Sequence, residues 1–271
     1  MKRRWGRDPF DLALRTAALA IFLALLLPLL VILGTSLNRL EVVQFPPQGL
    51  SLSWYKAIFE DPFIWKDAFG LSLRIALITV ALSLLLGYSA ALGMRYAPEV
   101  AKVLDVLLLS PLFVGFVVLG LALLMFFNRV WPTLGATPAI IVAHTLISAP
   151  YVLRIARATL HAFDPAMEEA ASNLGASGRQ VLWKVTLPII RPGIIAGGIF
   201  AFILSFNNVM LSLMLAKPGL QTLPVFMFNQ IQYSFNPLLA SISFLLILFM
   251  GVTLILVDRV VGFERALGLM V

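Results

Sequence analysis

Long apolar runs without a charged residue alternate with short polar segments along this chain. A helix needs about 20 apolar residues to cross the hydrocarbon core of a bilayer, and six stretches suit that length. The charge-free run from Pro218 to Val257 is too long for one crossing, and its first half is rich in amides, so the span is placed after Pro237. The pattern predicts spans at residues 16–38, 74–95, 105–128, 138–158, 192–216 and 237–258.

Composition narrows the fold class. The chain has 271 residues, of which 61% are hydrophobic and 12% charged, whereas a soluble domain averages about 25% charged residues. We therefore expect an all-α membrane protein that forms a single transmembrane domain over residues 1–271. The absence of cysteine excludes disulfides and thiolate metal sites.

The basic residues predict the orientation. The net charge is +7, but Lys and Arg are scattered along the flanks of the spans, which argues against a nucleic-acid partner. With a cytoplasmic N-terminus, fourteen of the 20 fall on the cytoplasmic side and five on the other, and Arg74 is assigned to neither side. Because cytoplasmic loops carry the excess of Lys and Arg, both termini and the loop at residues 159–191 are expected in the cytoplasm. The first apolar segment is too long for the core of a cleaved signal peptide.

The loop at residues 159–191 carries local signals for two short helices separated by a glycine turn. An N-terminal cap, a left-handed glycine and a capping box each satisfy backbone groups that a helix end leaves without partners. The second helix is expected to end before Pro188. The residues that give these signals are, in order, Asp164, Pro165, Gly175, Ser177 and Gln180.

Within this loop, the segment from Glu169 to Pro188 has the sequence EAASNLGASGRQVLWKVTLP. It resembles the EAA loop of the permease subunits of bacterial binding-protein-dependent ABC importers, with Val185 where that family usually has isoleucine. The resemblance implies a coupling helix between the fourth and fifth spans that docks on a cytoplasmic ATPase. The alternative is an amphipathic surface helix whose glutamates face water. The docking residues that the resemblance implies are Glu168, Glu169, Ala170, Ala171 and Gly175.

A second resemblance narrows the family. The segment from Ser36 to Pro62, SLNRLEVVQFPPQGLSLSWYKAIFEDP, is similar to the periplasmic segment of spermidine/putrescine-type permeases and of relatives that handle iron, phosphonates and opines. The segment from Ser205, SFNNVMLSLMLAKPGLQTLPVFMFNQI, is similar to the same group. Together with the EAA loop, the similarity covers nearly the whole chain.

The resemblance implies a multi-pass protein of the bacterial inner membrane that works by alternating access in an ATP-driven importer. The expected partners are two ATP-binding subunits, a second permease subunit, a periplasmic substrate-binding protein and the lipid bilayer. The second permease is either a copy of this chain or a different chain, and we expect a different one. ATP and Mg are expected on the partner ATPase and no cofactor on this chain, which has no G-x-x-x-x-G-K-[ST] phosphate loop.

The expected solute is a polyamine or a related small amino or organic solute. Many polyamine-type members carry an acidic pair where this chain has Asn207 and Asn208, so a less cationic solute (a phosphonate, an opine or an amino-acid-like compound) or iron is the alternative. Polar residues within spans either serve a pathway or join helices. We expect one asparagine to face a water-filled cavity and the other to pack against a helix. The pathway candidates are Asn207, Asn208, Ser205, Phe206, Tyr88 and Tyr151.

No pattern for catalysis or metal binding stands out, so no catalytic residue and no metal site is expected. His144 and His161 lie far apart in the sequence, and His144 either serves function within the fourth span or is hydrogen-bonded inside the bundle. A secondary transporter without an ATPase would show intramembrane ionisable relays and internal repeats, and neither is visible. A membrane scaffold would leave the EAA spacing unexplained. Gly193 and Gly197 predict close packing of the fifth span against a neighbouring helix.

Overall fold

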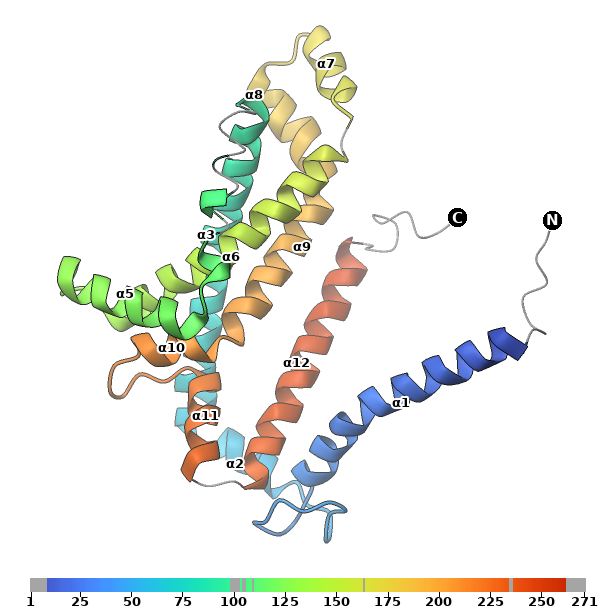
Figure 1. The fold of residues 1–271 in the computed structure, drawn as a ribbon, viewed down its shortest axis with the longest axis vertical. Helices are drawn as coiled ribbons and strands as arrows, with labels where there is room; N and C mark the ends of the chain where they lie inside the picture. The colour runs from blue at the N-terminus through green and yellow to red at the C-terminus, as the bar shows by residue number, and fades with distance from the viewer. Residues whose placement is uncertain are drawn as a thin grey trace. The chain divides into compact units, whose positions relative to one another are not determined.

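A computed structural model of the chain describes residues 9–97, 103, 106–108, 110–162, 164–233 and 236–261 (Figure 1). The regular elements of these residues are helical, which confirms the all-α expectation, and one isolated bridge pairs Asn38 with Leu50. The elements are α1 (Pro9–Ser36), α2 (Ser53–Glu60), the π-helix η1 (Phe63–Phe69), α3 (Gly70–Tyr96), the 3₁₀ turn η2 (Ser110–Phe113), α5 (Phe116–Val130), α6 (Ala136–His161), α7 (Ala166–Asn173), α8 (Gly178–Val181), the π-helical turn η3 (Leu182–Thr186), α9 (Leu187–Phe206), α10 (Val209–Leu215), α11 (Leu223–Tyr233) and α12 (Pro237–Val261).

Five helical stretches in the described part of the chain are long and apolar enough to cross a bilayer, and α5 is apolar but shorter. Each of the five overlaps a predicted span, and α5 overlaps the remaining one. The stretches are Leu12–Ser36, Phe63–Arg95, Ala136–His161, Gly178–Phe206 and Pro237–Ile255.

The predicted span at residues 105–128 is not one helix in the described residues. A 3₁₀ turn at Ser110–Phe113 precedes Gly115, whose ψ of 138° is extended, and α5 begins only at Phe116. Proline cannot sit inside an α-helix without losing a hydrogen bond, so Pro111 breaks an otherwise continuous apolar run. Residues 105 and 109 of this predicted span lie outside the described residues.

The predicted span at residues 192–216 is also divided, because α9 ends at Phe206 and α10 begins at Val209. The sequence predicted that the helix beginning near Gly178 ends before Pro188. In the structure this helix continues to Phe206. Pro188 lies in the first turn of α9, directly after the π-helical turn η3. A π turn shifts the hydrogen-bond pattern by one residue, which lets the chain pass a proline without ending the helix.

The described residues form two compact units. The first contains the described residues up to Pro62 together with Asn229–Phe249, and the second contains Phe63–Phe228 together with the described residues from Met250 onward.

In the second unit, α3, α6 and α9 pack closely at glycines. A Cβ at Gly87 would lie 2.7 Å from Val152 Cγ1 and 2.9 Å from the backbone nitrogen of Leu153, so α3 and α6 are almost in backbone contact there. A Cβ at Gly193 would overlap the side chain of Thr159 on α6. The predicted close packing of this part of α9 is therefore confirmed, and its partner helix belongs to the same chain. The core here comprises Tyr88, Ala91, Met94, Val152, Leu153, Ala156, Leu160, Ile190 and Ala201.

A second core cluster joins α5 and α10 to α3 and α6. The short helix α10, which follows Asn207 and Asn208, therefore packs against the same bundle as α9. Its buried residues are Ile75, Phe127, Ala139, Ile140, Ala143, Ile147, Leu211 and Leu215.

In the first unit, Asn38 organises the segment that follows α1. Its side chain is fully buried, with Nδ2 donating to the Val42 carbonyl at 2.9 Å and Oδ1 accepting from the Gln48 amide at 3.2 Å. The Trp54 indole donates to the Asn38 carbonyl at 2.9 Å, which holds α2 on the same segment. The family-like stretch from Ser36 to Pro62 is thus a structured cap built on one asparagine.

Candidate functional site

The loop between α6 and α9 contains the predicted short helix, glycine turn and second helix, although α7 has Pro165 and not Asp164 at its N-cap position, and the second helix continues into α9. Asp164 Oδ1 accepts from the Ala166 amide at 3.0 Å where α7 begins, and Gly175 has a φ of +87° where it ends. The Ala176 amide donates to the Ala171 carbonyl at 3.1 Å across this turn. A left-handed residue is favourable only for glycine, so Gly175 sets the direction in which the chain leaves α7.

The capping box at the next helix is confirmed. The Gln180 amide donates to Ser177 Oγ at 3.4 Å, and the Ser177 amide donates to Gln180 Oε1 at 2.8 Å. Both ends of the glycine turn are therefore fixed by local hydrogen bonds, and α7 is held at one end of the bundle of α3, α6 and α9 (Figure 1).

The two glutamates of α7 have different environments. Glu168 turns its carboxylate into the protein, where Arg95 binds it with both terminal nitrogens at 3.1 Å and Thr186 Oγ1 donates to it at 2.6 Å. Glu169, the next residue, is exposed. Successive helical residues point about 100° apart, which explains why only one of the pair reaches Arg95.

The contacts of Glu168 change its pKa. Partial burial raises the pKa of this carboxyl, but the hydrogen bonds from Arg95 and Thr186 and the positive charge of Arg95 lower it by more. The net effect holds the pKa of Glu168 below its ordinary value of 4.5, so this side chain is a carboxylate at neutral pH.

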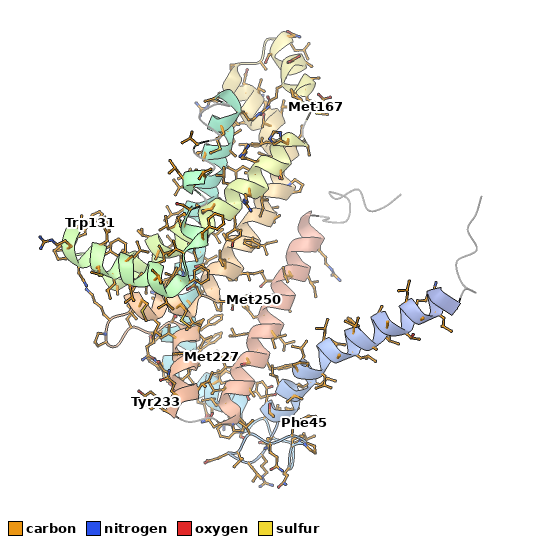
Figure 2. The ribbon with its side chains drawn as sticks, viewed as in Figure 1. Phe45, Trp131, Met167, Met227, Tyr233 and Met250 are labelled. Carbon is orange, nitrogen blue, oxygen red and sulfur yellow. The ribbon has the colours of Figure 1, made fainter. Side chains whose placement is uncertain are left out.

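The loop exposes large apolar side chains as well as charged ones. No residue of α7 is buried, and Met167 is 52% exposed, Leu174 89% and Trp183 63% (Figure 2 labels Met167). These three large side chains were not among the residues predicted from the sequence. Their position in a loop between two spans, beside the glycine turn and the capping box, is the signal that could have singled them out.

The Asn207–Asn208 pair forms a break between two helices. The Asn207 amide donates to the Ile203 carbonyl at 3.1 Å and ends α9, and Asn207 is exposed. Asn208 is 6% exposed, and its Oδ1 accepts from the Leu211 amide at 3.0 Å, which caps α10. Asparagine is among the best N-cap residues, so Asn208 has a structural role that its place in an apolar run concealed.

His144 joins the two helices at this break to α6. Its Nδ1 lies 2.9 Å from Ser205 Oγ on α9 and its Nε2 lies 3.2 Å from Ser212 Oγ on α10. The imidazole and Ser205 are both buried. His144 is thus hydrogen-bonded inside the bundle, and Ser205 is occupied by a contact between helices.

The six pathway candidates come from several helices and lie at two levels along the length of α9. Ser205, Phe206, Asn207 and Asn208 are at the break, where the Phe206 ring lies 5.9 Å from that of Phe69. Tyr88 and Tyr151 lie nearer Gly197 and Phe200, with the Tyr151 ring 4.8 Å from Phe200. At about 1.5 Å per residue, these levels are roughly 10 Å apart along the helix.

An apolar hollow of about 490 Å³ lies elsewhere, between α3 and α6 near Gly87 and Pro150. None of the six pathway candidates lines it.

Residues 83–263 match the model of the family described as the binding-protein-dependent transport system inner membrane component, a range that includes the whole EAA segment. The chain belongs to this family. It is therefore a multi-pass inner membrane protein and a permease component of a transport system that depends on a binding protein.

Two relatives are similar to the chain in sequence, and one solved structure has the same fold. It is 30% identical over 238 residues to the putrescine transport system permease protein PotI of Escherichia coli K12, covering 85% of this chain and 84% of that protein. It is 24% identical over 254 residues to the spermidine/putrescine transport system permease protein PotC of the same strain, covering 92% and 93%. A bacterial ABC transporter that imports the acidic polysaccharide alginate has a chain with the same fold, with a TM-score of 0.68, 17% identity and coverage of 96% of this permease and 99% of that chain.

Proposed function

We propose that this permease forms the translocation pathway of an ATP-driven importer for a polyamine-like solute delivered by a substrate-binding protein. The similarity to PotI, a putrescine permease, and to PotC, a spermidine/putrescine permease, supports the solute class. The observation that carries the ATP-driven part is the loop between α6 and α9, in which α7 exposes Glu169 and Met167 and the residues after it expose Leu174 and Trp183.

The exposed residues from α7 to η3 form the docking surface for an ATP-binding subunit in this proposal. Exposed apolar side chains grouped with charge are typical of a surface that binds another protein. Met167, Leu174 and Trp183 supply the apolar part, and Glu169 supplies the charge. The excess of basic residues on the side of the termini supports a cytoplasmic location for this surface, where ATP is available.

The assembly that we infer contains two ATP-binding subunits, which carry ATP and Mg, a second permease subunit that is a different chain, and the binding protein. Closure of the ATP-binding subunits would move the two docking surfaces toward each other. The helices of each permease would then reorient between inward-open and outward-open states.

Asn207 is the pathway residue that we favour at the helix break, and Asn208 is its structural neighbour. The C-terminal end of a helix carries partial negative charge, and interrupted helices bind ions and substrates at such ends in other transporters. The end of α9 and the exposed amide of Asn207 together suit an ammonium group without a carboxylate. Because this amide is itself neutral, a less cationic solute is the second candidate.

Reconstitution of the complete complex in proteoliposomes tests the proposal. We expect putrescine uptake that requires both internal ATP and the external binding protein. Uptake that follows an ion gradient in the absence of the ATP-binding subunits would instead identify a secondary transporter. Competition by a phosphonate, an opine and an amino acid, each at the same concentration, separates the two solute classes.

A further inference from the structure

The carboxylate of Glu168 is a meeting point of three elements that are distant in the sequence. Glu168 lies in the first turn of α7, Arg95 in the last turn of α3, and Thr186 at the end of η3, immediately before α9. Arg95 and Thr186 are 73 and 18 residues from Glu168 in the sequence. We propose that Glu168 is the positioning residue that transmits movement of α7 to the transmembrane helices α3 and α9, an inference that rests on the proposed docking of an ATP-binding subunit.

The geometry of the contact suits the transmission of force. A guanidinium that binds both oxygens of a carboxylate fixes its orientation as well as its distance, which a single hydrogen bond does not. The Thr186 hydroxyl adds a third hydrogen bond at 2.6 Å, and Thr186 is itself 1% exposed. The carboxylate therefore cannot shift without moving either α7 or the helix ends that hold it.

Other contacts of α7 are weaker anchors. None of its residues is buried, so the burial of apolar surface contributes little to holding it on the bundle. The Glu168 side chain is 22% exposed and that of Arg95 25%, so water screens this ion pair only in part.

The two adjacent glutamates then have different roles in coupling. Glu169 faces outward, toward the proposed ATP-binding subunit, and Glu168 faces inward, toward α3 and α9. A change at Glu169 should loosen docking, whereas a change at Glu168 should leave docking in place and reduce the movement that docking produces.

The experiment compares three variants in the complete reconstituted complex: Glu168→Gln, Glu169→Lys and Glu60→Gln. Glu60 is the matched control, because it forms an exposed ion pair with Lys56 in which both side chains are more than half exposed. For Glu168→Gln we expect the ATP-binding subunit to co-purify as in the wild type while uptake per ATP hydrolysed falls about tenfold, a typical size for coupling between two sites. Glu169→Lys should lose the ATP-binding subunit, and Glu60→Gln should match the wild type.

Cross-linking of α3 to α7 tests whether Glu168 acts as a mechanical link between these helices or through its charge. The chain has no cysteine, so the double variant Arg95→Cys/Glu168→Cys introduces the only two thiols of this subunit. We expect low uptake per ATP before treatment and recovery after a short bifunctional thiol reagent joins α3 to α7. Neither single cysteine variant should recover uptake per ATP after the same treatment.

Two results would overturn the inference. In one, Glu168→Gln transports as much solute per ATP as the wild type; in the other, it loses the ATP-binding subunit as Glu169→Lys does, which would make Glu168 a docking residue. Failure of the proposed function is distinguishable from both, because the wild-type complex would then show no uptake driven by ATP.

Discussion

At the scale of single residues, neighbours in the sequence take opposite roles in two places. Glu168 faces Arg95 while Glu169 is exposed, and Asn208 caps a helix while Asn207 is exposed. In each pair, one residue holds structure and the other offers a polar group to a ligand or partner. Substitutions at Glu168 and Asn208 should therefore lower stability, whereas substitutions at Glu169 and Asn207 should reduce docking or transport without lowering it.

The lowered pKa of Glu168 predicts a pH-dependent contribution to stability. A carboxyl whose pKa is lower in the folded state stabilises the fold above its unfolded pKa, and this contribution is lost as the pH falls through the folded-state value. We expect Glu168→Gln to reduce the free energy of unfolding by about 1 kcal/mol at pH 7, the upper end for a partly exposed ion pair. Thermal unfolding of the wild type and of Glu168→Gln in detergent from pH 7 to pH 3 measures this contribution. The difference in stability between the two proteins should begin to close below pH 4.5, the ordinary pKa of this carboxyl. A gap that stays constant over this range would show that ionisation is not its cause.

At the scale of helices, the break after Phe206 separates two effects in the asparagine pair. Asn208→Ala should lower stability by about 1 kcal/mol, because it removes the N-cap of α10. Asn207→Leu should leave the melting temperature unchanged and reduce uptake, because its amide is exposed. Melting and uptake measured on the same preparations test both statements. Normal transport by Asn207→Leu would remove this residue from the pathway.

The crossing of α3 and α6 at Gly87 offers a second test at this scale. A Cβ there would meet Val152 and the backbone of Leu153, whereas no other residue in the described part of the chain comes within 4 Å of a Cβ at Gly93 on the same helix. Overpacking typically costs about 1–3 kcal/mol, so Gly87→Ala should lower the melting temperature clearly. Gly93→Ala should be neutral or slightly stabilising, because alanine favours helix. Equal effects of the two variants would contradict the packing described here.

Local sequence signals predicted local structure well, and long-range contacts could not be predicted from them. Gly175 and the Ser177–Gln180 box depend on residues within three or four positions, so the sequence identified them correctly. The partner of Glu168 is 73 residues away, and no periodicity points to Arg95. The break at Asn207 was concealed because the apolar run continues beyond it, and hydropathy does not distinguish a cap from a helix interior.

At the scale of the whole molecule, one membrane subunit combines features that serve different partners. Its apolar helices belong in the bilayer, and its family places it in an inner-membrane transport system that depends on a binding protein. The central claim is that the exposed residues from α7 to η3 meet an ATP-binding subunit in the cytoplasm.

Photocross-linking in the transport-active complex tests that claim most directly. A benzoylphenylalanine at Leu174, 89% exposed beside Gly175, should capture the ATP-binding subunit. The same probe at Leu50, 75% exposed in the segment predicted to face the periplasm, should not. We expect capture of the ATP-binding subunit from Leu174 and not from Leu50. A complex that transports solute while Leu174 captures no ATP-binding subunit, or while Leu50 captures it, would contradict the account.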